Sequence, residues 1–336
     1  MKRILPLFLA LALLLTGCAA VSTTESTSQT VSQVDSPSSA PESASSQLES
    51  VGEVSITDSN GSQITLDTSA PRVVAAYGSF AEAWLLAGGE LCGVTQDALE
   101  QRDLGLPEDI AVVGTVKEPN AEEIIALEPD LVLLASDITA QAEIRDVLEN
   151  AGLACAFFQV DTFADYAFMM EQLCAVTGRE DLYEENVTQV GQQIEEAQAN
   201  AALSSTRPNV LLIRAFSTGI KAKTDDELAG AILKDLGAHN IADDHPSMLE
   251  DLSLEEVIAA DPDYIFVTTM GDEQKALDYL NGLIQQNPAW SELSAVKEDR
   301  YIVLPKDLFH YKPNNRWGES YQYLGEILYP QLFHEE

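Results

Sequence analysis

Basic residues are scarce in this chain of 336 residues. Lysine and arginine together number 18 against 55 aspartates and glutamates, so the formal net charge is −37. Proteins that bind nucleic acids carry a basic footprint, and this composition therefore argues against a nucleic-acid partner. The same charge disfavours electrostatic adhesion to anionic lipid and keeps the surface soluble and self-repelling.

Cysteine and histidine are rarer still, with four of each. After Cys18 only Cys92, Cys155 and Cys174 remain, and their unrelated spacings offer no disulfide framework. We expect these three to be small buried hydrophobic residues. The chain has no Gly-x-Ser-x-Gly, no His-Glu-x-x-His and no phosphate-binding glycine loop. We therefore predict that it is not an enzyme and carries no intrinsic cofactor.

Long hydrophobic runs are also missing beyond the first residues. Lys2 and Arg3 precede an apolar stretch from Ile4 to Leu15, which is shorter than the ~20 residues of a membrane span and is typical of a signal peptide. The sequence Leu-Thr-Gly-Cys18 follows and resembles the lipobox of bacterial lipoproteins. We predict a signal peptide over residues 1–17, acylation of Cys18 and a location on the extracytoplasmic face of the cell membrane.

Residues 18–51 are composed almost entirely of serine, threonine, glutamine, alanine, glutamate and proline, without an aromatic residue. Such a segment cannot bury enough apolar surface to offset its chain entropy, so we predict a disordered tether. The remaining residues are numerous enough for two lobes with hydrophobic cores.

The body begins with a predicted hairpin around Asn60-Gly61, between two alternating runs at 54–57 and 63–66. Apolar strands then alternate with amphipathic helices, as in the strand 155–158 followed by the helix 163–177. Another strand, 131–134, precedes a helix over 138–150. This alternation predicts βαβ units, and hence an α/β fold whose sheets are mainly parallel.

A long helix is predicted after Gly178. Apolar residues recur at a four-three spacing from Tyr183 to Ala201, which indicates one helix of more than twenty residues with a single buried stripe. We therefore divide the body into an N-terminal lobe (52–178), a connecting helix (179–206) and a C-terminal lobe (207–336), with a ligand cleft between the lobes.

An internal repeat supports two related lobes. Residues 121–134 return as 254–267, with six of fourteen positions identical. In each copy a cap candidate, Asn120 or Ser253, precedes a glutamate by three residues, which predicts a capping box. That box uses the second glutamate of each Glu-Glu pair. Glu122 and Glu255 are left over, and complementation of the helix dipole is their alternative explanation.

The order of these motifs over about 280 residues resembles the substrate-binding proteins of ABC importers for iron-siderophore, haem and cobalamin. Landmarks are Pro71-Arg-Val-Val-Ala-Ala, the Glu-Glu repeats and Asn287-Pro-Ala-Trp. The resemblance implies two lobes joined by one long helix, and a monomer that delivers an iron complex, haem or a corrinoid to a permease dimer with a cytoplasmic ATPase. It also implies permease docking through one glutamate on each lobe, and Glu122 and Glu255 occupy the matching positions.

Ligands of open α/β sheets lie beyond the carboxyl ends of the strands. That rule nominates a set of polar and aromatic residues as ligand contacts: Tyr77, Phe80, Lys117, Arg214, Phe216, Met270, His310, Tyr311 and Arg316. Arg214 is placed to hold a carboxylate or hydroxamate oxygen, and a salt bridge to a nearby acid is the alternative. His310 or Met270 is a candidate axial ligand for haem iron.

Two other functions stay open. His239 and His245 flank Asp243-Asp244, which offers ligands for zinc or manganese and would suit a receptor for a bare metal ion. A surface adhesin is the other alternative, and it predicts no stabilisation by any ligand.

Overall fold

The computed structural model describes residues 53–67, 70–250 and 252–333, all within one compact unit that spans Glu49–Glu336. The signal peptide (1–17), the lipidation at Cys18 and the tether (18–51) are predictions that lie outside the described residues. No helix in the described part of the chain combines the length and apolar character needed to cross a membrane.

The predicted hairpin opens the fold. Strands β1 (Val54–Thr57) and β2 (Gln63–Leu66) pair antiparallel. Gly61 in the turn has a φ of +80°, a left-handed conformation that glycine adopts without steric cost. Asp58 closes the turn, because its Oδ1 accepts the backbone N–H of Asn60 at 2.9 Å.

The N-terminal lobe is built on a five-stranded sheet in which every neighbouring pair is parallel. In spatial order its strands are β5 (Ala111–Val112), β4 (Leu91–Val94), β3 (Val73–Ala75), β8 (Leu131–Ala135) and β9 (Ala154–Phe158). A two-stranded ribbon is formed by β6 (Gly114–Thr115) and β7 (Glu118–Pro119). β3 and β8 are buried at every residue, as expected for parallel strands covered on both faces.

Six helices of this lobe are α1 (Gly78–Leu86), α2 (Asp97–Glu100), α3 (Ala121–Ala126), α4 (Thr139–Glu143), α5 (Arg145–Asn150) and α6 (Phe163–Thr177). The prediction of one helix over 138–150 was wrong, because the chain turns at Ile144 and forms two short helices. α6 matches its predicted range, and Thr162 and Asp165 form a capping box at its start.

The C-terminal lobe contains a second sheet in the order β11-β10-β13-β14, with β12 added beside β10. Its strands are β10 (Asn209–Phe216), β11 (Gly219–Lys223), β12 (His239–Asn240), β13 (Tyr264–Thr269) and β14 (Tyr301–Val303). Only the β10–β11 pair is antiparallel, so the expectation of mainly parallel sheets is confirmed.

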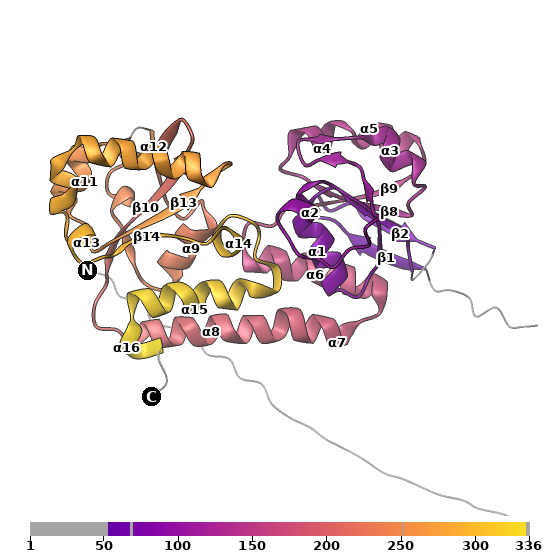
Figure 1. The fold of residues 1–336 in the computed structure, drawn as a ribbon. Helices are drawn as coiled ribbons and strands as arrows, with labels where there is room; N and C mark the ends of the chain where they lie inside the picture. The colour runs from indigo at the N-terminus through magenta and orange to yellow at the C-terminus, as the bar shows by residue number, and fades with distance from the viewer. Residues whose placement is uncertain (1–52, 68–69, 251, 334–336) are drawn as a thin grey trace, which may run out of the picture. The chain divides into compact units, whose positions relative to one another are not determined.

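Helices surround this second sheet (Figure 1). They are α9 (Leu228–Asp235), α10 (Ser247–Glu250), α11 (Leu254–Ala260), α12 (Glu273–Gln286), α13 (Ser294–Lys297), α14 (Lys306–Phe309), α15 (Trp317–Leu328) and α16 (Pro330–Phe333). Short 3-10 turns occupy Ile241–Asp243, Pro288–Glu292 and Asn314–Arg316.

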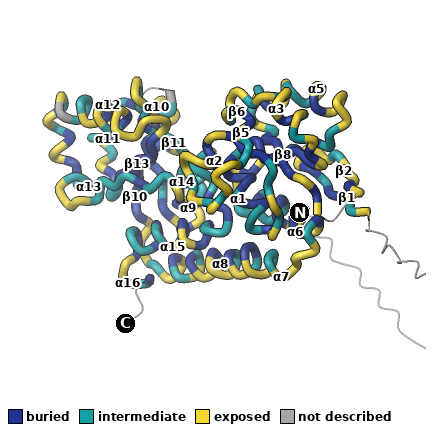
Figure 2. The backbone as a smooth tube through the Cα atoms, turned by 45° about the vertical axis from the view of Figure 1, so that its right-hand side comes forward, coloured by how far each residue is buried: buried dark blue, intermediate teal, exposed yellow. Residues whose placement is uncertain are grey.

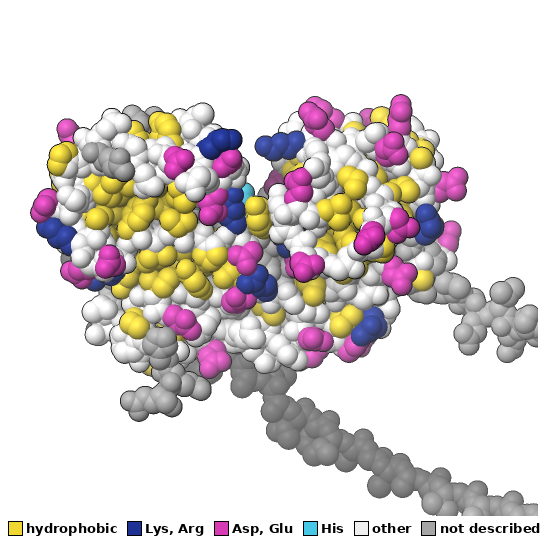
Figure 3. Space-filling model, viewed as in Figure 1, with side chains coloured by type: hydrophobic (Ala, Val, Ile, Leu, Met, Phe, Trp, Pro, Cys, Tyr) yellow, Lys and Arg dark blue, Asp and Glu magenta, His cyan; other side chains and the backbone are white. Residues whose placement is uncertain are grey.

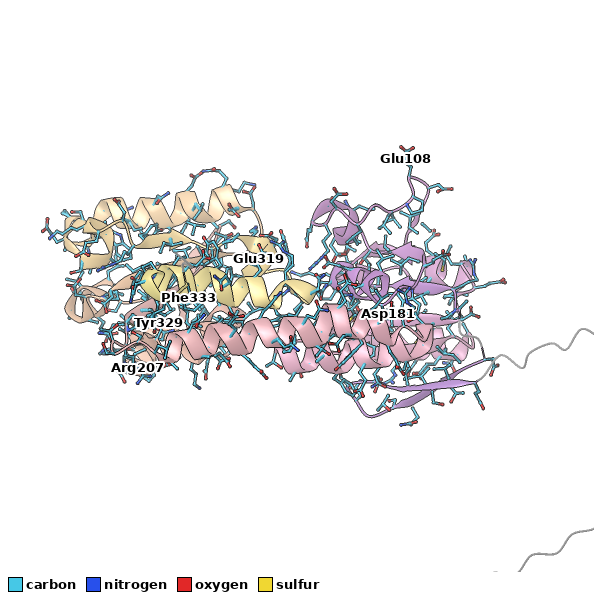
Figure 4. All side chains as sticks on the ribbon, turned by 90° about the horizontal axis from the view of Figure 1, so that it is seen from below. Glu108, Asp181, Arg207, Glu319, Tyr329 and Phe333 are labelled. Atoms are coloured by element: carbon cyan, nitrogen blue, oxygen red, sulfur yellow. The ribbon has the colours of Figure 1, made fainter. Side chains whose placement is uncertain are left out.

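One helix runs between the two lobes, from Glu180 to Ala202. It comprises α7 (Glu180–Tyr183), a π-helical turn (Glu184–Thr188) and α8 (Gln189–Ala202). The predicted apolar stripe is buried along it from Val187 to Ala201, and Tyr183 at its start is half-buried (Figure 2). The wide turn was not predicted; there the buried Asn186 donates to the carbonyls of Leu86 and Leu182 at 3.2 and 3.1 Å. α15 lies along α8 (Figure 4).

The internal repeat corresponds to a repeated structure. In both lobes a short helix (α3 or α11) leads through a turn into a buried strand (β8 or β13). Glu128 and Asp261 stand at equivalent places in the two turns and have φ values of +47° and +40°. The Pro-Asp dipeptide that follows each of them directly precedes the strand.

The hydrophobic core is shared between the lobes. One cluster of buried residues extends from the N-terminal sheet through α6, α8 and α15 to one face of the C-terminal sheet. Separate clusters cover the opposite face of each sheet. Each sheet is therefore covered on both faces, and its strand ends are left as the positions open to a ligand.

Candidate functional site

A cleft of about 540 Å³ opens at the carboxyl ends of strands from both sheets, a size usual for small-molecule sites. It is lined by Tyr77, Asp97, Gln101, Val116, Lys117, Asp137, Ile138, Asp161, Arg214, Asp226, Glu227, Leu228, Met270, Gly271, Phe309, His310, Tyr311 and Lys312. Figure 3 shows the surface hollowed between the lobes, with acidic and basic side chains on the rims. A polar hollow of about 490 Å³ along α8 and α15 lies away from these strand ends.

Tyr77 lies two residues after the end of β3 and lines the cleft from the N-terminal lobe. Burial, followed by the nearby carboxylates of Asp97 and Asp137, raises the pKa of its hydroxyl to about 12. A phenol so shifted stays protonated at neutral pH and keeps its hydrogen-bond donor. Phe80 does not line the cleft: it is 1% exposed and packs edge-on against Tyr77 and Phe158, so its nomination as a ligand contact was wrong.

Arg214, at the end of β10, lines the cleft but is not free. Its guanidinium pairs with Glu227, and Lys223 binds the same carboxylate with Nζ 3.0 Å from Oε1. The arginine and glutamate side chains are only 16% and 15% exposed. The alternative explanation, a salt bridge to a nearby acid, is therefore the one that the structure contains. One guanidinium nitrogen, Nε, is buried and has no hydrogen-bond partner among the described residues.

The segment after α14 supplies the opposite wall. His310 lines the cleft, and its pKa falls to about 4 because of burial first and then the charges of Arg214, Lys306 and Lys312. Its imidazole is therefore neutral at physiological pH, the state in which it binds metals. Met270, 40% exposed, lines the same cleft, so both candidates for an axial iron ligand are in the candidate site.

Two other nominated residues lie outside the cleft. Phe216 ends β10 half-buried and is not part of the lining. Arg316 pairs with Asp307 and Glu319, each at 2.7 Å, and lines a different hollow beside Arg102. The structure therefore places neither of these two residues in the lining of the cleft. A position at the end of a strand, as for Phe216, does not by itself fix the direction of the side chain, and Arg316 is held by its two ion pairs.

The alternative metal site is not assembled in the described chain. His239 Nε2 lies 2.7 Å from Asp244 Oδ2, but no group of three or more histidine, cysteine, aspartate or glutamate side chains converges among the described residues. Of the three free cysteines, Cys155 and Cys174 are buried as expected, whereas Cys92 is half-buried.

Comparison with known proteins then identifies the family. A family profile described as periplasmic binding protein matches residues 73–308, most of the body. The chain belongs to the periplasmic binding protein family. The family resemblance and the two-lobed α/β fold predicted from the sequence are thereby confirmed.

Individual relatives of this periplasmic binding protein agree with that assignment. It is 26% identical to the Fe(3+)-citrate-binding protein YfmC of Bacillus subtilis (strain 168) over 273 residues, 78% of this chain and 82% of the relative. The TroA-like periplasmic binding protein FepB from Veillonella parvula superposes with a TM-score of 0.68 at 20% identity, covering 83% of this chain and 91% of that one. The structure of S. aureus IsdE complexed with heme superposes with a TM-score of 0.62 at 19% sequence identity, covering 77% of this chain and 99% of that one.

In this periplasmic binding protein, Glu122 and Glu255 occupy equivalent exposed positions in the first turns of α3 and α11. Neither carboxylate has an ion pair or hydrogen bond to another described residue. The caps Asn120 and Ser253 are confirmed, since their side chains accept backbone N–H groups of the following helix. The predicted capping boxes were wrong in their second half: within the described chain neither Glu123 nor Glu256 accepts the N–H of its cap residue, and Glu256 accepts from the hydroxyl of Ser247 instead.

The structure also reveals cleft residues that the sequence did not single out: Asp97, Gln101, Asp161, Asp226, Glu227 and Leu228. A positioning residue was missed as well. Gln141 is fully buried, accepts the N–H of Ala135 and donates to the carbonyls of Ala76 and Val116 at 2.7 and 3.1 Å. It therefore ties together the loops that present Tyr77 and Lys117. A lone glutamine in a helical pattern carries no signal of this role.

Proposed function

We propose that this protein is the lipid-anchored, extracytoplasmic binding component of an ABC importer. It captures an iron complex (a siderophore or haem) or a corrinoid and delivers it to a permease dimer driven by a cytoplasmic ATPase. The protein acts as a monomer, and no chemical step is needed: binding and delivery are the mechanism.

The observation that carries this proposal is the cleft itself. Both lobes contribute side chains to a cavity of about 540 Å³, which suits a compact organic complex. Aromatic rings from Tyr77 and Tyr311 provide apolar walls, and a neutral imidazole and a thioether are within the same lining. The ligands in the names of YfmC and IsdE, ferric citrate and haem, belong to the same broad class and support the choice.

Delivery is assigned to Glu122 and Glu255. Each is exposed, each lies on one lobe at the start of a helix, and neither has a partner within the described chain. An exposed carboxylate without an ion pair or hydrogen bond to a described residue is available to an arginine of a permease.

The test is a double charge reversal, Glu122→Lys with Glu255→Lys. Uptake of radiolabelled iron complex by cells that depend on this receptor should fall to background. The affinity of the purified protein for the same complex, followed by tryptophan fluorescence, should stay within about twofold, since neither residue lines the cleft.

The matched control is Glu171→Lys with Glu195→Lys, which makes the same charge change at exposed positions on α6 and α8. It should leave uptake intact. Normal uptake in the Glu122/Glu255 variant would remove the docking assignment. An equal loss of uptake in the control would show that the loss comes from the change in net charge and not from docking.

A further inference from the structure

The cleft carries more negative than positive side chains. Its acids are Asp97, Asp137, Asp161, Asp226 and Glu227, and its bases are Lys117, Arg214 and Lys312. His310 adds no charge at neutral pH, because burial and the neighbouring cations lower its pKa to about 4. Five acids against three bases leave the lining with a net negative charge.

The cleft cations are also largely engaged. Arg214 pairs with Glu227, and Lys312 donates to the carbonyl of Val160 and lies 3.1 Å from Asp161 Oδ1. Only Lys117, which is exposed, has no ion pair or hydrogen bond to another residue of the described chain. An anionic ligand would therefore meet one available cation, or would have to break an existing pair.

The acids, in contrast, are not all neutralised. Asp137 has no ion-pair or hydrogen-bond partner within the described residues. Asp97 is 8% exposed; its Oδ2 accepts the N–H of Gly78 at 2.7 Å, whereas no described residue donates a hydrogen bond to its buried Oδ1. A negatively charged complex placed among these oxygens would be repelled, and like charges brought together at a binding surface weaken association strongly.

The remaining lining suits the opposite kind of ligand. The rings of Tyr77 and Tyr311 offer apolar faces, and aromatic faces attract cations. The hydroxyls of Tyr77 and Tyr311 have no hydrogen-bond partner in the described chain, and they are donors for neutral chelating oxygens. Donors of this kind bind without requiring charge on the ligand.

We infer that the cleft selects iron chelates of neutral or positive net charge, the hydroxamate type, and discriminates against anionic catecholate or carboxylate chelates. This inference rests on the proposed function as an iron-complex receptor. The inferred ligand differs from the one in the name of YfmC, the 26% identical Bacillus subtilis relative, which is Fe(3+)-citrate, an anionic carboxylate chelate.

A charge series on one ferric trihydroxamate core tests the inference. Ferric desferrioxamine B has a pendant ammonium and is cationic, its N-acetyl derivative is neutral and its N-succinyl derivative is anionic. Dissociation constants are measured with the full chain by fluorescence quenching and calorimetry. Each step toward negative charge should weaken binding about tenfold at low salt, and this ratio should shrink as salt screens the lining charges.

Variants locate the effect in the cleft. Asp137→Asn should reduce the penalty on the anionic complex about threefold, since it removes an unpaired carboxylate. Glu195→Gln makes the same charge change on the exposed face of α8 and should leave the series unchanged. Equal or tighter binding of the anionic complex would overturn the inference.

Different results would contradict the charge selectivity of the cleft and the proposed receptor function. If a ferric catecholate or ferric citrate binds and the hydroxamates do not, the charge inference is wrong, whereas the receptor function stands. If hydroxamate, catecholate and citrate complexes, haem and cobalamin all leave fluorescence and thermal stability unchanged, the proposed function fails and the charge inference fails with it.

Discussion

Asn314 holds the cleft wall that carries His310, Tyr311 and Lys312 against the N-terminal lobe. The residue is fully buried, with a φ of +52°. Its Nδ2 donates to the Ser79 carbonyl at 2.9 Å and to Glu82 Oε2 at 2.6 Å, and its Oδ1 accepts from the Ser79 hydroxyl at 3.3 Å. The substitution Asn314→Ala removes all three bonds and leaves buried oxygens with fewer donors.

The expected magnitude follows from these contacts. Two neutral hydrogen bonds at about 1 kcal/mol each and one to a carboxylate at about 2 kcal/mol give a loss of about 4 kcal/mol. Alanine also tolerates the left-handed backbone less well than asparagine, by about 1 kcal/mol. For a body of this size, such a loss lowers the melting temperature by about 10 °C.

Urea unfolding, followed by far-UV circular dichroism and tryptophan fluorescence, measures the change in the free energy of unfolding. Asn314→Gly should cost about 1 kcal/mol less than Asn314→Ala, because glycine accepts the positive φ. Asn314→Asp should cost at least as much as alanine, since it brings a second carboxylate against Glu82. The exposed Asn150→Ala is the control and should stay within about 0.5 kcal/mol of the unmutated protein. A loss below about 1 kcal/mol for Asn314→Ala would refute the reasoning.

Two other predictions concern charge in the cleft. The pKa of His310 falls from 6.5 to about 4 on folding. Between these two pH values the unfolded chain binds the proton and the folded chain does not, so the free energy of unfolding should decline as the pH drops from 6.5 to 4. His310→Gln should flatten this decline above about pH 5, and equal slopes for the variant and the unmutated protein in urea titrations would contradict the prediction. Glu227→Gln removes the carboxylate that pairs with Arg214 and Lys223 and should cost about 3 kcal/mol of unfolding free energy. The same variant should tighten the anionic N-succinyl complex about tenfold, and an unchanged dissociation constant would show that Arg214 cannot reach the ligand.

The fold was predictable because its signals are local and repeated. Strand and helix periodicity gave both lobes, and the copy of residues 121–134 at 254–267 predicted the same helix-turn-strand unit that α3-β8 and α11-β13 form. The wide turn around Asn186 was not predictable in this way. It is stabilised by hydrogen bonds to Leu86 and to Leu182, and the first of these joins segments 100 residues apart.

The candidate site was predictable by position but not by direction. Strand ends located Tyr77, Lys117, Arg214 and Met270 correctly in the cleft. Phe80 follows the same strand as Tyr77, yet the helical start of α1 turns its ring into the core. Gln141 shows the converse case, in which a residue without a motif positions two cleft loops through tertiary hydrogen bonds.

Arg214 was predicted to bind the ligand because it is a cation in an acidic chain, but an acidic composition makes an internal ion pair the more expected state of an arginine. With 55 acids and 18 bases, most cations have a carboxylate within reach, so pairing is the expected state and carries little information. Within the described chain Arg102, Arg145, Arg179, Arg214, Arg300 and Arg316 all form ion pairs. A cation that remains unpaired in such surroundings is therefore the more informative feature. In the cleft that cation is Lys117, and recognition of a ligand oxygen by a charged donor falls to it before it falls to Arg214.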